Sequence, residues 1–397
     1  MAPEVDSKRL NRLLREPTVD ELRSSRRIKW HRYDADVLPA WVAEMDFPLA
    51  PAIRETIEGA IAEEGFGYPR LPMDPRFRDA FVGWMEQRFS RSVDPGMVRA
   101  LTNVVQAFDI GILLYSEPGE GVVLQTPLYA PFHMSVDGNR RRRVESPLVR
   151  GAERYEIDFD HLSSVIGSDV RVFMLCNPHN PTGRVFERDE LERLAELVLA
   201  KDLIVVSDEI HADLVYPGSN YLPFASISPE IAARTLTVTS ATKAFNIAGL
   251  PMAVAIAGGP EMKKRLRQLP PMMLGHGGYL GNEAAIAAWR HGADWLDEVL
   301  GYLAGNLDLV SEFLQDRLPS VRFRPPEATY LAWLDCRGLD LPCQPFEFFL
   351  DKARVAMSDG ADFGEPGEGH VRLNFATSPT ILRESLERLA VAATGVA

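Results

Sequence analysis

A regular alternation of two residue patterns, between about residues 97 and 257, constrains the fold of this chain more than any other feature. Short apolar or β-branched runs are followed by stretches with helical periodicity, such as Glu187 to Leu199, which has leucines on one side and charges on the other. Strands that alternate with helices indicate βαβ units and a mostly parallel sheet covered on both faces. The sequence therefore predicts an α/β fold with strands at GVVLQ (121–125), VRVFML (170–175), LIVVS (203–207), TLTVTS (235–240) and MAVAI (252–256).

The chain beyond about residue 286 has a different pattern. Long amphipathic helices and isolated strands predict a smaller α+β domain there, and the N-terminal 45 or so residues have no strand partner close in sequence, so we expect them to pack with it. The predicted domains are a large one over residues 46–285 and a small discontinuous one over residues 1–45 and 286–397. In the latter we expect helices at Trp295 to Leu318 and Ile381 to Ala393, and strands at 330–335 and 371–375.

Charge and composition exclude several classes of protein. With 46% hydrophobic and 25% charged residues, the chain is not disordered, collagen-like or a coiled coil. Its formal net charge of −13 argues against nucleic acid as a partner, because binding to a phosphate backbone needs a basic surface. The four arginines at 140–143 are therefore interpreted as a solvated strand edge rather than a binding patch.

Cysteine usage and hydropathy indicate the compartment. The three cysteines, Cys176, Cys336 and Cys343, are too few and too far apart for a disulfide framework or a four-ligand zinc site, so we expect free thiols and no metal. The N-terminal residues contain no apolar signal core, and the apolar stretch from Leu236 to Gly259 is interrupted by a lysine, an asparagine and a proline. These features predict a cytoplasmic protein with no membrane partner.

Polar residues follow several predicted strands at the point where each strand ends. The segments are TPLY (126–129), NPHNPTG (177–183), SDEIH (207–211) and SATK (240–243). Asn180, Asp208 and Lys243 follow one another at intervals of about one βα unit, so they should meet at one edge of a parallel sheet. Each residue alone is more often a solvated surface or turn residue, and the joint occurrence is what points to a site.

Lys243 is the centre of the predicted chemistry. A lysine at a strand end, between small hydroxyl residues and apolar sequence, is placed where desolvation lowers its pKa and makes the amine a nucleophile that can form a Schiff base. Asp208, at a neighbouring strand end, suits a protonated pyridine nitrogen. Phosphate ligands would come from Ser240, Thr242 and, if a helix begins there, the N–H groups near Val104 and Val105, while Tyr129 could stack on a ring.

These motifs carry a family resemblance. NPHNPTG, SDEIH and SATKAFNIAGL resemble motifs of the fold-type I pyridoxal-phosphate (PLP) enzymes of the aminotransferase class I/II group. WVAEMDF (41–47), GFGYP (65–69), TPLYAPF (126–132) and VRLNFATSP (371–379) are similar to the MalY/PatB-type carbon–sulfur lyases, the cystathionine β-lyase branch. The resemblance runs from about Lys29 to Leu389 and implies a large domain with a mostly parallel seven-stranded sheet, next to a smaller α+β domain.

The resemblance also implies a role for each motif residue. The cofactor would be PLP and the active unit a homodimer with shared active sites. Lys243 would form the Schiff base with the cofactor. Around the ring, Asp208 would lie at the pyridine nitrogen, Asn180 at the ring oxygen, Tyr129 on the ring face and His211 beside the ring. The phosphate would be bound by Ser240, Thr242 and the amides of Val104 and Val105, and by Tyr68 of the other subunit. Lys243 and Tyr68 are the implied catalytic residues, and Arg372 would clamp the substrate carboxylate beside Asn180 and Tyr129.

Two positions favour a lyase over an aminotransferase within this resemblance. His211 stands where aspartate-type aminotransferases have Tyr, and Pro251 stands where they have a phosphate-binding Arg. The resemblance therefore implies β-elimination on cystathionine, cysteine or a cysteine S-conjugate, giving a thiol, pyruvate and ammonia. An aminotransferase is the alternative, and a regulatory protein with incidental catalysis is a third. Substrate selection is expected at His276 to Tyr279.

Overall fold

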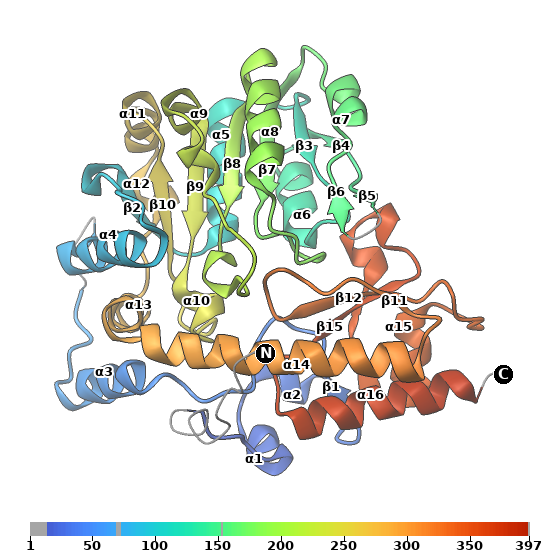
Figure 1. The fold of residues 1–397 in the computed structure, drawn as a ribbon. Helices are drawn as coiled ribbons and strands as arrows, with labels where there is room; N and C mark the ends of the chain where they lie inside the picture. Colours follow the sequence, from blue (N-terminus) through green and yellow to red (C-terminus); the bar gives the residue numbers. More distant parts are fainter. Residues whose placement is uncertain (1–13, 69–72, 152–153, 396–397) are drawn as a thin grey trace.

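The computed structural model describes residues 14–68, 73–151 and 154–395 (Figure 1), so residues 1–13 of the predicted small domain lie outside the described part. Its centre is a seven-stranded sheet in which only β10 runs antiparallel to its neighbours. In spatial order the strands are β2 (Val98–Leu101), β10 (Ala253–Ala257), β9 (Thr235–Thr239), β8 (Ile204–Asp208), β7 (Val170–Cys176), β3 (Gly121–Leu124) and β4 (Arg142–Glu145). The prediction of a mostly parallel sheet is confirmed.

In the central strands of this sheet, alternating side chains pack into two different cores. In β7, Val172 and Met174 face one layer of helices, while Phe173 and Leu175 face the other. The first layer contains α5 (Val104–Tyr115), α6 (Ala130–Gly138), α11 (Pro260–Gln268) and the short α12 (Pro271–Leu274). The second contains α7 (Phe159–Val165), α8 (Arg188–Ala200) and α9 (Pro229–Arg234). The fully buried strands explain the continuous apolar runs in the sequence.

The arginine run at 140–143 lies at the edge of this sheet, but the prediction that all four side chains are solvated is wrong for Arg141. Among the described strands β4 pairs with β3 alone, and the other three arginines are exposed. Arg141 is buried because its guanidinium donates to Ser116 and to the Asn139 carbonyl. Arg142 pairs with Asp169 at 2.5 Å, and Arg143 pairs with Asp137. Charged side chains on an edge strand discourage pairing with another chain.

A second sheet lies to the side of the long helix α14 (Figure 1). Its four antiparallel strands are β11 (Arg322–Phe323), β12 (Leu331–Asp335), β15 (His370–Asn374) and β14 (Ser358–Asp359). α14 (Ala293–Arg317) and α16 (Pro379–Thr394) pack against each other beside it, and α15 (Pro345–Phe348) and the π-helical turn η4 (Phe349–Ala353) complete this region. The predicted strands and both predicted helices are therefore present, with ends shifted by a few residues.

The N-terminal residues run into this second region. β1 (Leu38–Pro39) pairs in parallel with β13 (Val355–Ala356), and the backbone N–H of Asn374 donates to the carbonyl of Ala40 at 2.9 Å. α1 (Val19–Ser24) and α2 (Ile28–His31) precede β1, and Leu22 and Trp30 form a small cluster with Ile381 of α16. The two chain ends are thus in contact, and the exact domain boundaries stay a prediction.

The remaining elements connect these layers. They are α3 (Pro51–Ala62), α4 (Pro75–Phe89), α10 (Ala241–Ala244), α13 (Tyr279–His291), the hairpin of β5 (Val149–Arg150) and β6 (Tyr155–Glu156), and the 3₁₀ turns η1 (Pro95–Met97), η2 (Ala212–Leu214), η3 (Phe224–Ser226), η5 (Gly360–Phe363) and η6 (Glu365–Gly367). Within the residues that the structure describes, no helix combines the length and apolar composition that a membrane crossing requires.

Candidate active site

A cavity of about 380 Å³ lies at the carboxyl ends of the parallel strands. Its walls come from the central sheet, from the N-terminal residues 41–43 and from the second sheet with η5. This is the edge at which open α/β sheets bind ligands. The predicted site residues that line the cavity are Val104, Val105, Tyr129, Asn180, Asp208, His211, Thr242, Lys243 and Arg372.

Parallel pairing brings the three central residues together. The backbone N–H of Asn177, just after β7, donates to the carbonyl of Asp208 at the end of β8 at 3.0 Å. The next residue, Glu209, donates to Val238 of β9 at 2.8 Å, and Lys243 follows β9 on the short helix α10. Asn180, Asp208 and Lys243 therefore reach the same cavity because their strands end in register.

Lys243 has a buried amine with a lowered pKa. Its Nζ donates a 3.0 Å hydrogen bond to the carbonyl oxygen of Ala43. Burial, and then the positive charge of Arg372, lower the pKa of Lys243 to about 8, against the opposing effects of Glu44 and Asp208. Near neutral pH, a useful fraction of a lysine with such a pKa is in the neutral, nucleophilic form.

Asp208 is a buried carboxylate that lacks a close cation. Its Oδ1 accepts a 3.0 Å hydrogen bond from the backbone N–H of Ile210, and burial raises its pKa to about 7. Among the described residues, no lysine or arginine lies within ion-pair distance of it. A positively charged group entering the cavity at this point would stabilise the ionised form of Asp208.

The start of helix α5 presents free backbone donors to the cavity. Asn103 caps this helix, because its side-chain oxygen accepts from the N–H of Gln106 at 2.9 Å. The N–H groups of Val104 and Val105, in the first turn, have no partner within the helix. The side chain of Gln106 donates to the carbonyls of Met273 and Leu274 at 2.7 and 3.0 Å, which ties α12 to this helix start. Free N–H groups at a helix start suit a phosphate.

Arg372 of β15 projects a buried guanidinium into the same cavity. Its Nη1 donates to Oδ1 of Asn180 at 2.9 Å, and its Nη2 donates to the Trp41 carbonyl and the Ser358 hydroxyl, both at 3.1 Å. Its buried Nε has no partner among the described residues, and the guanidinium lies over the Phe363 ring at 4.9 Å. Burial lowers the pKa of Arg372 to about 10, so the group stays charged at neutral pH. It is placed to bind an anion.

His211 lines the cavity as a neutral imidazole. It is 3% exposed, and its Nδ1 has no partner among the described residues. Burial and the positive charges of Lys243 and Arg372 lower the pKa of His211 to about 3. A buried polar atom without a partner is costly, which suggests that a bound molecule satisfies it.

Two predicted residues lie away from the cavity wall. The Ser240 hydroxyl donates to the Met252 carbonyl at 2.6 Å and caps α10 by accepting from the N–H of Thr242 at 3.1 Å. Tyr68 is fully exposed and lies in a separate hollow of about 200 Å³, which Tyr279 also lines. The segment from His276 to Tyr279, where substrate selection was expected, does not line the main cavity.

Sequence reasoning gave no role to the segment that covers the cavity, residues 41–46. Its Ala43 carbonyl accepts from both Lys243 and the Tyr330 hydroxyl, each at 3.0 Å. Asn374 donates from Nδ2 to the carbonyls of Val42 and Glu44 at 2.6 and 2.7 Å. The motif WVAEMDF includes this segment, but every residue type has a backbone carbonyl. A contact made by a carbonyl therefore cannot be predicted from the residue types.

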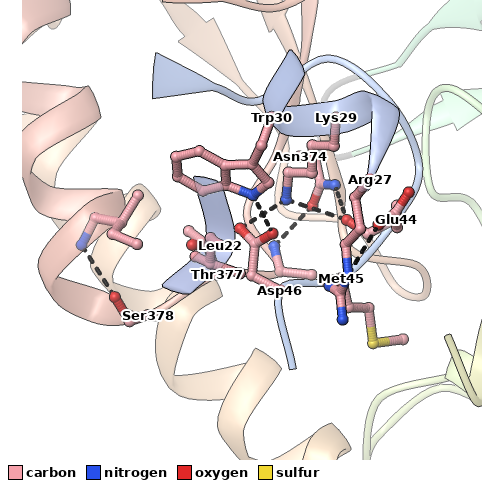
Figure 2. A network of polar contacts seen from close by, with 12 residues as sticks. Leu22, Arg27, Lys29, Trp30, Glu44, Met45, Asp46, Asn374, Thr377 and Ser378 are labelled. Atoms are coloured by element: carbon pink, nitrogen blue, oxygen red, sulfur yellow. Dashed lines mark hydrogen bonds and ion pairs between the residues drawn. The ribbon is translucent and has the colours of Figure 1, made fainter. Parts of the chain in front are cut away.

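A buried ion pair fixes the far end of this cover segment (Figure 2). The Lys29 ammonium lies 2.8 Å from Asp46, and both side chains are 1% exposed. The Asp46 carboxylate also accepts from the Trp30 indole N–H at 2.8 Å, and Lys29 donates to the Glu44 carbonyl at 3.1 Å. A buried charge pair with its hydrogen bonds satisfied specifies one arrangement of the chain.

The residues of this cavity fit pyridoxal 5'-phosphate. A buried lysine with a lowered pKa, a buried carboxylate without a cation and free N–H groups at a helix start match the aldehyde, the ring nitrogen and the phosphate of that cofactor. Fold and site together define a PLP-dependent enzyme of fold type I.

Comparisons with known proteins identify the family. The chain belongs to the aminotransferase class I and II family, whose model matches residues 42–389. It is 36% identical over 383 residues to cystathionine beta-lyase PatB of Bacillus subtilis, covering 94% of this chain and 98% of the relative. A putative PLP-dependent beta-cystathionase structure from Corynebacterium diphtheriae is similar with a TM-score of 0.90 and 35% identity, over 96% of this chain and 99% of that one. Cystalysin from Treponema denticola, whose structure contains pyridoxal 5'-phosphate, is similar with a TM-score of 0.90 and 29% identity. The similarity covers 97% of this chain and 99% of cystalysin.

Proposed function

We propose that this protein is a PLP-dependent carbon–sulfur β-lyase that acts on cystathionine, cysteine or a cysteine S-conjugate. In this reaction the Cα–H and Cβ–S bonds break and one water is consumed, so that one thiol, one pyruvate and one ammonia are formed. The observation that carries the proposal is the single cavity that holds a buried lysine, a buried carboxylate and a buried arginine. Similarity to PatB and to the beta-cystathionase supports the lyase reaction in particular.

Arg372 would hold the substrate. Its guanidinium is already oriented by Asn180 and by the Trp41 carbonyl, so little side-chain freedom is lost on binding a carboxylate. The substrate α-carboxylate would take the place closest to the unpartnered Nε. The Phe363 ring beneath the guanidinium fixes its plane.

Lys243 would move the proton. When bound, PLP supplies an electron sink that allows the Cα proton of an amino acid to leave. The Nζ of Lys243, with its pKa lowered to about 8, can accept that proton near neutral pH. The Ala43 carbonyl would hold the resulting ammonium.

Other residues of this chain would hold the cofactor. Asp208 would bind the ring nitrogen, Asn180 the ring oxygen and Tyr129 the ring face, while Thr242 and the amides of Val104 and Val105 would bind the phosphate. Ser240 would support this group through Thr242, since the two side-chain oxygens lie 2.9 Å apart. The apolar walls keep bulk water from the reacting atoms.

Assembly and compartment are part of the proposal. We propose a homodimer in which Tyr68 of each subunit serves the other cavity, because this aromatic side chain is fully exposed and lies away from its own cavity. We also propose cytoplasmic localisation, because Cys176, Cys336 and Cys343 are free thiols, as is typical of a reducing compartment. The domain boundaries at residues 45/46 and 285/286 are retained as proposals.

An aminotransferase is the alternative, because the family model describes aminotransferases and the same cavity would serve both reactions. The state of the cofactor separates them. Purified holoenzyme is mixed with excess S-ethyl-L-cysteine in the absence of any keto acid. A lyase returns the cofactor to its aldehyde form after every turnover, whereas an aminotransferase converts it once to the amine form and stops. Quantitative conversion to the amine, without pyruvate, would overturn the lyase assignment.

A further inference from the structure

A second carboxylate lines the active-site cavity besides the buried Asp208. The side chain of Asp362, on the 3₁₀ turn η5, is exposed and lies on the same wall as Arg372 and Phe363. Asp208 is 5% exposed and lies at the sheet end, where the cofactor ring is proposed to bind. Asp362 is therefore the carboxylate that remains for the substrate.

The turn that carries Asp362 is held firmly. Asp359 caps it by accepting from the N–H of Ala361 at 3.1 Å, and the N–H of Leu128 donates to the carbonyl of Phe363 at 2.8 Å. The Phe363 ring is 3% exposed between Trp333 and the Arg372 guanidinium. The position of the Asp362 backbone is thus set by both sheets rather than by a loose loop.

The Asp362 carboxylate has no structural partner that would explain it. No described residue makes a hydrogen bond or an ion pair with it, whereas the other carboxylate of this turn, Asp359, is engaged as a cap. Burial lowers the pKa of Arg372 overall, and the negative charge of Asp362 is one of several smaller influences that oppose this lowering. The cavity therefore presents a fixed cation and, beside it, an unpaired anion.

We propose that Asp362 determines substrate specificity, selecting cysteine S-conjugates whose sulfur substituent has a net positive charge, such as an aminoethyl group, and disfavouring anionic substituents. This inference rests on the proposed lyase function. Arg372 is occupied by the α-carboxylate of the substrate, so a distal group near Asp362 meets a negative charge. In a cleft with apolar walls, such a charge acts more strongly than on an open surface.

Three substrates of similar shape test the proposal. S-aminoethyl-, S-ethyl- and S-carboxymethyl-L-cysteine carry a positive, a neutral and a negative substituent on the same sulfur. The substitution Asp362→Asn should lower kcat/KM for the aminoethyl substrate about fivefold. It should change kcat/KM for the ethyl substrate by less than about twofold, and it should raise kcat/KM for the carboxymethyl substrate. Asp359→Asn is the matched control, since it removes a charge from the same turn outside the cavity and should leave the three values in their original ratio. An unchanged ratio of aminoethyl to carboxymethyl activity in Asp362→Asn would overturn the proposal.

Equilibrium binding keeps this test separate from the reaction. L-lysine, L-norleucine and L-aminoadipate replace the sulfur of the same three compounds by a methylene group, so no thiol can leave. Holoenzyme should bind L-lysine more tightly than L-aminoadipate, and the preference should shrink in Asp362→Asn and at high salt. If none of the sulfur compounds yields pyruvate but this preference is present, the lyase function fails and the role of Asp362 stands. If pyruvate forms but the preference is absent, the role of Asp362 fails alone.

Discussion

At the scale of single residues, burial sets the chemistry of this cavity. Lys243 and Asp208 are ordinary ionisable residues whose pKa values move toward neutrality because both are buried. The sequence was sufficient to predict that these residues meet, because both follow parallel strands of known direction. It could not predict that Ser240 caps a helix, nor that Asp362 lines the cavity, because both outcomes depend on the three-dimensional course of turns.

The lowered pKa of Lys243 predicts a pH dependence for cofactor attachment. Only the neutral amine reacts with the PLP aldehyde, and its fraction rises about tenfold per pH unit below the pKa. With a pKa of about 8, the rate at which apoenzyme attaches PLP should rise up to about pH 8 and level off by about pH 9. Stopped-flow absorbance of the apoenzyme mixed with PLP measures this rate. A rate that keeps rising tenfold per unit to about pH 10 would indicate an ordinary lysine and contradict the burial argument.

At the scale of elements, the strand ends position the site and a short irregular segment covers it. The predicted strands at 121–125, 170–175, 203–207, 235–240 and 252–256 are confirmed to within one or two residues. β2, at the far edge of the sheet, was not predicted, because its sequence VRAL is too short and mixed to stand out. The cover segment, residues 41–46, was recognised as a motif. Its contacts with Asn374 and Lys243 were not predicted, because these two residues lie hundreds of positions further along the chain.

Asn374 is predicted to position the cover segment. Asn374→Ala removes hydrogen bonds to the carbonyls of Val42 and Glu44 and should lower the free energy of unfolding by about 2–4 kcal/mol, with a rise in substrate KM. Asn306→Ala is the matched control, because Asn306 is also buried and donates to two carbonyls, those of Phe375 and Thr377, both at 2.8 Å. Denaturant unfolding and steady-state kinetics measure both effects. Equal KM values in the two variants would show that the hydrogen bonds of Asn374 to the cover segment serve stability alone.

At the scale of the whole molecule, the chain ends meet in one region, and several large apolar side chains are exposed elsewhere. They are Tyr68, which is fully exposed, and Phe66, Met272 and Met273, which are partly exposed. Exposed apolar side chains of this size commonly mark an interface. The fold class and the pairing of the chain ends could be argued from sequence, but the accessible surface of single side chains could not.

The proposed dimer predicts complementation between two inactive variants. Lys243→Ala lacks the reacting amine, and Tyr68→Phe is expected to lose most of its activity if Tyr68 binds the phosphate in the other subunit. Mixed dimers from co-expression contain one cavity with both residues intact and should regain up to about half of the activity per mixed dimer. Light scattering gives the oligomeric state, and affinity tags of two kinds isolate the mixed dimers. Mixed dimers without regained activity would mean that Tyr68 acts within its own subunit or not at all.

Product analysis with L-cystathionine shows whether this cavity catalyses carbon–sulfur β-elimination through Lys243. Purified holoenzyme is incubated with L-cystathionine without any keto acid, and thiol, pyruvate and ammonia are quantified over many turnovers. We expect the three products to appear in equal amounts, and Lys243→Ala to form none of them at a comparable rate. Amino-group transfer to an added keto acid, with no pyruvate or ammonia in its absence, would contradict it.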